Sequence, residues 1–156
     1  LQAQWLDARV RELVYNTIAP PAASSQCQIT GTVVDCSGLR ALRSPEWVFA
    51  GSIEQRFPLS SGDEIVANLF SRYEGSRELD ISYIPETRTG SSTRTDAVLT
   101  YRFRNQGLSI SAFINNIEDE VVISNATPNP SYSANGVVAV TLRAPRTFGM
   151  RLSGTF

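Results

Sequence analysis

The stretch Arg146-Thr-Phe-Gly-Met-Arg-Leu-Ser-Gly-Thr-Phe156 alternates strictly between two kinds of residue. On a strand, one face of this segment would carry Phe148, Met150, Leu152, Gly154 and Phe156. The opposite face would carry Arg151 and small polar residues, so one face suits hydrocarbon and the other suits water. Chain ends usually fray in solvent, and a strand that runs to the last residue therefore favours a sealed β-barrel over a soluble sheet.

The composition is compatible with either kind of β protein. The chain has 156 residues, of which 42% are hydrophobic and 19% are charged, as in an ordinary globular domain. A transmembrane barrel has a similar average, because only every second strand residue faces lipid. The formal net charge of -1 and the lack of a basic block argue against a nucleic-acid partner. No apolar run reaches the length of about 18 residues that suggests a spanning helix.

Alternation predicts six strands, near residues 4–15, 45–58, 64–75, 93–104, 108–121 and 146–156. The first segment also matches a helical stripe through Leu6, Val10, Leu13 and Val14. We interpret it as a strand because the rest of the chain alternates.

Short and long connections alternate between these strands. Tight-turn signals follow the second and fourth strands, at residues 60–63 and 105–107. Long polar stretches follow the first, third and fifth strands. This arrangement is typical of outer-membrane barrels, whose periplasmic turns are short and whose extracellular loops are long.

Charged residues keep to one face of the predicted strands. The proposed lipid faces of the second to sixth strands carry no Asp, Glu or Arg, and an Arg at the bilayer midplane would cost about 2 to 4 kcal/mol. A soluble sandwich could show the same segregation. Aromatic residues near the strand ends favour the membrane barrel, because they would form girdles at both interfaces. They are Trp47, Phe57, Tyr73, Phe103, Phe148 and Phe156.

Three motifs together resemble a known family. The closing segment 144–156, with Pro-Arg-Thr-Phe-Gly and a terminal Phe, resembles the last strand of TonB-dependent outer-membrane receptors. Residues 113–119, Phe-Ile-Asn-Asn-Ile-Glu-Asp, resemble the penultimate-strand box of that family, usually Asn-Leu-x-Asp. Residues 37–47 resemble its strand entry Ser-Gly-x-x-Leu-x-x-x-Pro. The likeness covers residues 37–156, with departures at Ile117, Glu118 and Gly154.

The resemblance implies an all-β, antiparallel up-and-down transmembrane β-barrel. This chain would supply the last six of about 22 strands, without the plug domain or the TonB box. Because six strands cannot close at that curvature, and residues 1–5 carry no targeting signal, we expect the C-terminal part of a longer protein.

The implied function is TonB-energised uptake across the bacterial outer membrane. Ferric siderophores are the commonest ligands, with cobalamin or oligosaccharides as alternatives. The implied partners are outer-membrane lipid, the barrel-assembly machinery, TonB acting through the missing N-terminal part, and the ligand. A soluble six-stranded sandwich with a binding or adhesin role, or a passive porin segment, remains the alternative.

Few residues suggest a site. Arg77, Arg88 and Arg94 could contact an anionic ligand, or they could be surface arginines without one. Cys27 and Cys36 lie in an expected outward loop in an oxidising compartment, which favours a disulfide over two separate thiols. The segment that resembles the barrel-assembly signal comprises Phe148, Gly149, Met150, Leu152 and Phe156.

The residue types of the chain give little support for an enzymatic function. The chain has no histidine, so the common catalytic triads and zinc motifs are excluded. The acidic run 118–120 would point to both faces of a strand, which favours a solvated rim over a shared metal or acid–base site. We expect no catalytic residue, no metal site and no cofactor.

Overall fold

The computed structural model describes residues 1–18, 24–104, 107–129 and 136–154. They form an all-β fold of antiparallel sheets with one 3-10 helix, η1 (Pro85–Thr87). The strands are β1 (Gln2–Trp5), β2 (Val14–Asn16), β3 (Gln28–Thr30), β4 (Val33–Asp35), β5 (Trp47–Pro58), β6 (Glu64–Glu74), β7 (Arg77–Glu78), β8 (Arg88–Thr89), β9 (Ser92–Arg102), β10 (Leu108–Asn115), β11 (Ile123–Pro128), β12 (Val138–Leu142) and β13 (Thr147–Gly154).

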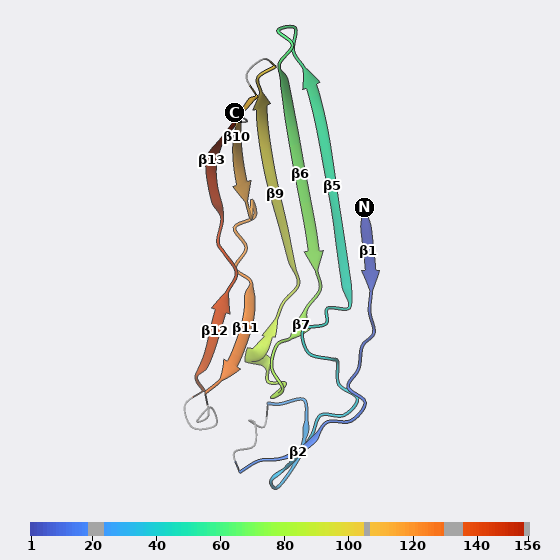
Figure 1. The fold of residues 1–156 in the computed structure, drawn as a ribbon. Coiled ribbons are helices and arrows are strands. Elements are labelled where there is room, and N and C mark those ends of the chain that lie inside the picture. Colours follow the sequence, from blue (N-terminus) through green and yellow to red (C-terminus); the bar gives the residue numbers. More distant parts are fainter. Residues whose placement is uncertain (19–23, 105–106, 130–135, 155–156) are drawn as a thin grey trace.

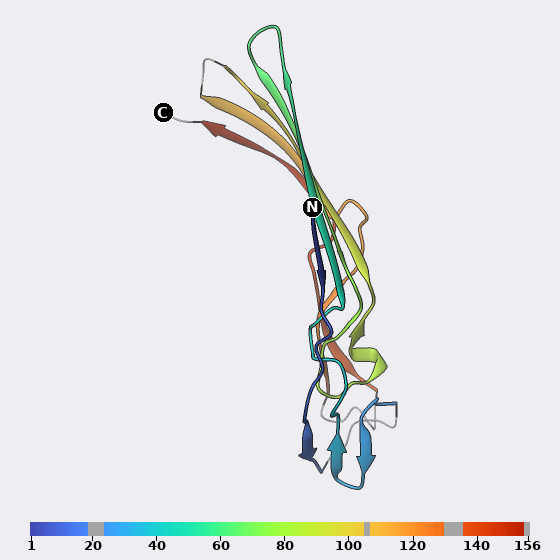
Figure 2. The ribbon, with the colours of Figure 1, turned by 90° about the vertical axis from the view of Figure 1, so that its right-hand side faces the viewer.

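The main sheet is a six-stranded meander in the order β1-β5-β6-β9-β10-β13 (Figure 1). Its long strands pair without a register shift: β6 joins β5 from Glu64 to Glu74 and joins β9 over the same residues. Successive side chains on a strand point to opposite faces, so this register brings like residues together in rows across the sheet. The sheet is bent and twisted along its length (Figure 2).

Short turns lie at one end of this sheet and the long connections at the other (Figure 1). The turn between β5 and β6 is closed by the amide of Leu59, which donates to the carbonyl of Asp63 at 2.9 Å. Gly62 there has a φ of 88°, a conformation that a glycine adopts without steric cost. The amide of Phe103 donates to the carbonyl of Leu108 at 3.0 Å between β9 and β10.

The first predicted strand, 4–15, is wrong as one continuous element. β1 pairs with β5 of the main sheet, and this pairing ends at Trp5 and Trp47. β2 belongs to a separate sheet, where it pairs with β4. Pro45 lacks an amide hydrogen and interrupts the edge of the partner strand just beyond Trp47. The intervening residues make a single bridge, between Arg9 and Arg40.

Two further boundaries differ from the expectation. The fifth strand, expected to reach residue 121, ends at Asn115 because Asn116 takes a φ of 55° and turns the chain. The long polar stretch after the fifth expected strand, for which no strand was predicted, contains the hairpin of β11 and β12. Phe156 of the last expected strand lies outside the described residues.

The longest connection forms a small sheet with its own core. Strands β2, β4 and β3 pair in that order. A disulfide joins Cys27, which precedes β3, to Cys36, which follows β4. The disulfide packs with Val34 and Tyr83, both of which are fully buried. Tyr83 belongs to the connection after β7, and its hydroxyl donates to the carbonyl of Arg40 at 2.6 Å. Two long connections are therefore packed into one unit.

The main sheet does not close on itself within the described residues. Its edge strands are β1 and β13, which have no pairing with each other. The sheet is therefore open in this part of the chain.

Replacing Cys27 and Cys36 together with alanine should loosen the β2-β4-β3 sheet and leave the main sheet intact. A disulfide over so short a loop is worth about 2.5 to 3 kcal/mol in the chain-entropy model. Hydrogen exchange should rise in residues 24–37 and stay unchanged in β6. Ser25→Ala is the matched control, because it removes a hydroxyl that donates to the carbonyl of Ser82 and accepts from the amide of Cys27 but keeps the disulfide. Equal exchange in both variants would contradict a stabilising role.

Candidate functional site

One face of the main sheet is apolar, uncharged and uncovered. Across five strands, one row consists of Ile53, Leu69, Ala97, Ile114 and Phe148. No described position on this face carries a charge, and several of its large side chains are exposed by half or more. Those exposed by more than half include Ile53, Leu99, Phe148, Met150 and Leu152. Soluble monomers rarely leave so continuous an apolar surface in water.

Aromatic rings gather at both ends of this apolar face. Toward the long connections, Trp47 lies 6.4 Å from Trp5 and 5.6 Å from Phe49, whose ring is 6.0 Å from Tyr73. Toward the short turns, the rings of Tyr101 and Phe103 lie 4.8 Å apart.

Phe148 does not belong to either aromatic group, although its place near a strand end suggested it. Strand β13 starts halfway along the sheet, where Phe148 pairs with Ile114. It therefore contributes to the middle of the apolar face.

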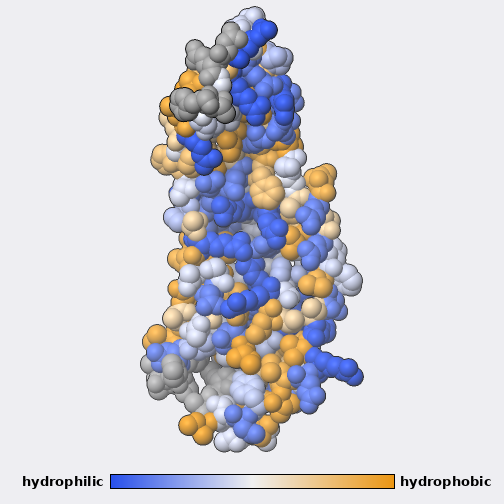
Figure 3. Space-filling model, viewed as in Figure 1, coloured by the Kyte–Doolittle hydropathy of each residue, from blue (hydrophilic) through white to orange (hydrophobic). Residues whose placement is uncertain are grey.

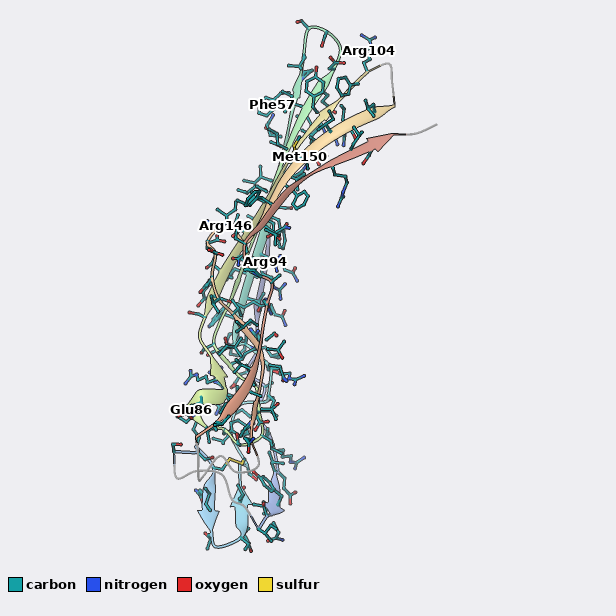
Figure 4. All side chains as sticks on the ribbon, turned by 90° about the vertical axis from the view of Figure 1, so that its left-hand side faces the viewer. Phe57, Glu86, Arg94, Arg104, Arg146 and Met150 are labelled. Atoms are coloured by element: carbon teal, nitrogen blue, oxygen red, sulfur yellow. A yellow bond between two sulfur atoms is a disulfide. The ribbon has the colours of Figure 1, made fainter. Side chains whose placement is uncertain are left out.

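The opposite face carries the charged residues. Figure 4 shows Phe57 and Arg94 projecting to opposite sides of the sheet, and Figure 3 shows hydrophilic side chains gathered along the middle of one face. Arginines on it pair with acids two residues away or on the neighbouring strand. The pairs are Arg56–Glu54, Arg72–Glu74, Arg94–Asp96 and Arg102–Glu64. Four arginines on this polar face thus have a countercharge beside them.

Glu74 is the centre of the densest charge cluster. It is 8% exposed and accepts hydrogen bonds from Arg72 at 2.8 Å, Arg77 at 2.9 Å and Arg143 at 3.0 Å. Arg143 follows β12, so the cluster ties the β11–β12 connection to the end of β6. Three guanidinium groups around one carboxylate leave a local excess of positive charge. We call these four residues the Glu74 cluster.

A depression of about 260 Å³ lies beside the Glu74 cluster. Arg94 and Asp96 line its other side, together with Asn116 and Glu120. It opens where the polar face meets the long connections.

The three predicted ligand residues fall into two places. Arg94 lies on β9 and lines the depression beside the Glu74 cluster, while its Nε contacts Asp96 at 3.2 Å. Arg77 is buried and belongs to the cluster itself. Arg88 is exposed and donates to the hydroxyl of Ser76 at 3.0 Å. Their role in binding stays a prediction.

Sequence reasoning missed Glu74, Arg72 and Arg143. Arg72 and Glu74 carry a usable signal, since they lie on the polar face at the end of a strand next to a long connection. Arg143 carries none, because it is 69 residues from Glu74 and follows a hairpin that the sequence did not predict.

The acidic run 118–120 protects the free edge of β9. Strand β10 pairs with β9 only as far as Ala97, and beyond this point Glu118 accepts a bond from the amide of Thr95 at 2.8 Å. Glu120 accepts a bond from the amide of Thr93 at 2.8 Å. The hydrogen bonds to Thr95 lower the pKa of Glu118. Two carboxylates of this run therefore accept the backbone hydrogen bonds that a neighbouring strand would otherwise accept, and the run is not freely solvated.

The residues that resemble the barrel-assembly signal lie on the edge strand β13. Phe148, Met150 and Leu152 project from the apolar face. On the other face, a Cβ at Gly149 would lie 2.8 Å from the ring of Phe113, so this glycine makes room for the ring. Phe156 lies outside the described residues.

No family model, curated protein or solved structure matches this chain. The described residues contain no helix long and apolar enough to cross a membrane. They also contain no group of three or more His, Cys, Asp or Glu side chains placed to hold a metal ion. Functional inference therefore rests on the two faces of the sheet and on its charge cluster.

Glu74→Gln should destabilise the end of the sheet near the long connections. Removing one partner of a buried ion pair typically costs about 3 to 5 kcal/mol, and Arg77 is the buried partner here. Hydrogen exchange should increase in residues 74–79 and 138–143. The control is Glu64→Gln, whose pair with Arg102 is half-exposed and worth less than about 1 kcal/mol. Equal effects of the two substitutions would contradict a central role for Glu74.

Proposed function

We propose that this chain forms the C-terminal part of the β-barrel wall of a TonB-dependent outer-membrane receptor. The observation that carries the proposal is the uncovered, uncharged face of the six-stranded sheet, opposite a face rich in paired charges. Transmembrane barrels have this distribution, with an apolar surface toward lipid and a polar lumen.

The dimensions of the apolar face support a membrane wall. Trp47 and Phe57 lie ten residues apart on β5, which corresponds to about 34 Å of strand. At a tilt of about 40°, this length spans about 26 Å along the membrane normal, close to the apolar band of about 25 Å in known barrels. The aromatic rings at both ends would then lie at the two interfaces.

The open edges support a place within a larger barrel. Unpaired amide and carbonyl groups are not tolerated in hydrocarbon, so β1 and β13 need partner strands there. A barrel of about 22 strands would supply them. This six-stranded sheet would form about a quarter of the wall.

Ligand would be captured at the end with the long connections, and TonB would act through a plug outside this chain. There the Glu74 cluster and Arg94 border the depression on the polar face. Arginines with a local excess of positive charge suit an anionic ligand such as a ferric siderophore. Cobalamin and oligosaccharides are the alternative ligands.

A soluble binding sandwich is the main competing function. It would require a second layer over the apolar face, and the described residues provide none. A passive porin would share the wall but not the energy coupling.

Leu69→Arg should abolish assembly into the outer membrane, whereas Asn68→Arg should be tolerated. Leu69→Arg places a charge in the middle of the apolar face, where an arginine at the bilayer midplane costs about 2 to 4 kcal/mol. Asn68→Arg places the same charge on the polar face. The readout is heat-modifiable migration of the membrane-extracted protein. Equal assembly of both variants, or a monodisperse detergent-free monomer of the wild type, would argue for the sandwich.

Uptake should stop when the proton gradient is collapsed or TonB is deleted. The test is accumulation of labelled ferric siderophores, cobalamin and oligosaccharides in cells that produce the whole receptor. Uptake that persists without TonB would identify a passive porin.

A further inference from the structure

The depression beside the Glu74 cluster is lined by charges of both signs. Its volume of about 260 Å³ is below the range of about 300 to 1,000 Å³ that is usual for pockets holding a drug-sized ligand. It therefore has room for one small unit of a ligand. The charged residues that line it are Arg72, Arg94, Arg143, Glu74, Asp96 and Glu120. Three arginines and three carboxylates balance, so the lining is strongly polar without a net charge.

Two of these arginines lie directly opposite each other on neighbouring strands. Arg72 on β6 and Arg94 on β9 are register partners on the polar face. Like charges at opposite positions destabilise a sheet, so an anion between them would be stabilising. Nε of Arg72 contacts Glu74 at 2.8 Å, and the side chain is 42% exposed. Nε of Arg94 contacts Asp96 at 3.2 Å, and the side chain is 39% exposed. The terminal nitrogens of both arginines are therefore within reach of a ligand carboxylate.

Two carboxylates of the lining are fixed by backbone amides. Oε2 of Glu120 accepts a hydrogen bond from the amide of Thr93 at 2.8 Å. Oδ1 of Asp96 accepts one from the amide of Asn116 at 2.9 Å. A carboxylate held in this way accepts hydrogen bonds from hydroxyl groups and repels other anions. The lining therefore suits a ligand that combines a negative charge with hydroxyl donors.

An aromatic ring adds an apolar contact to the depression. Phe70 lines it and is 42% exposed, although it lies on the polar face. Its register partner on β9 is Asp96. An aromatic side chain offers a large, flat apolar surface, and the C–H face of a sugar ring packs well against such a surface. The combination of paired arginines, fixed carboxylates and one ring matches the chemistry of a sugar acid.

We propose that the depression binds one sugar-acid unit of an acidic oligosaccharide. The carboxylate of the sugar would accept hydrogen bonds from Arg72 and Arg94. Its hydroxyl groups would donate to Glu120 and Asp96, and its ring would lie against Phe70. A ferric siderophore with several negative charges fits this lining less well, because the fixed carboxylates would repel it. The inference rests on the proposed function and names the ligand class of its capture site.

The test uses the whole receptor purified in detergent and isothermal titration calorimetry. The probe is a trisaccharide of galacturonic acid, compared with the same trisaccharide after reduction of its carboxyl groups to alcohols and with ferric citrate. The wild type should bind the acidic trisaccharide most tightly, because only this probe offers both carboxylate and sugar hydroxyl groups.

Replacing Arg72 and Arg94 together with glutamine should lower the affinity for the acidic trisaccharide by about tenfold or more. Arg94→Gln alone, which leaves the Glu74 cluster intact, should lower it in the same direction. The matched control is the replacement of Arg56 and Arg102 with glutamine. It removes two paired arginines from the same face outside the depression and should leave the affinity unchanged.

Glu120→Gln separates a sugar acid from a ligand that is only an anion. The substitution removes a negative charge, so it should raise the affinity for a simple anion such as ferric citrate. A sugar hydroxyl loses a charged acceptor, so the affinity for the acidic trisaccharide should fall by about threefold or more.

Equal affinity of the wild type for the acidic and reduced trisaccharides would overturn the proposal. Equal effects of the test and control arginine variants would do the same, as would tighter arginine-dependent binding of ferric citrate. Heat-modifiable migration of every variant checks that the barrel has assembled. An assembled receptor that fails these binding tests would refute only the sugar-acid site, whereas a wild type that does not assemble in the outer membrane would refute the proposed function itself.

Discussion

The pairing register of β5, β6 and β9 is the constraint on which the other features depend. Because side chains alternate, a slip of one residue would move every apolar side chain of a strand to the charged face. The unbroken ladder from Glu64 to Glu74 on β6 prevents this on both sides of the strand. It keeps Leu69 in the apolar row and Asn68 opposite. The lipid wall that we propose follows directly from this register.

The long connections are held at one end of the sheet by interactions of a different kind. The disulfide between Cys27 and Cys36 and the buried ring of Tyr83 join two of them. The Glu74 cluster joins the β11–β12 connection to β6 through Arg143. Charged side chains also complete the sheet where strands are missing, as Glu118 and Glu120 do along β9. Ordered connections allow pockets to form at defined positions beside the sheet.

The strands of the main sheet could be predicted well where alternation was long and charge was segregated. The expected segments 45–58, 64–75 and 93–104 correspond closely to β5, β6 and β9. The prediction for 4–15 was wrong because alternation does not report whether a partner strand is present, and Pro45 interrupts that partner. The hairpin of β11 and β12 was missed because its surroundings are rich in turn residues. The clustering around Glu74 requires contacts between residues that are distant along the chain.

By itself, the sequence determined the two-faced strands and the alternation of short and long connections. These properties are local, since strand periodicity and turn chemistry depend on neighbouring residues. Only the tertiary structure decided that Trp5, Trp47, Phe49 and Tyr73 form one aromatic group and that three arginines share Glu74. It also decided that a polar pocket lined by Arg40 and Arg88 and an apolar groove along the sheet both include Tyr73. Such arrangements depend on which strands lie side by side and in which register, and no single segment carries that information.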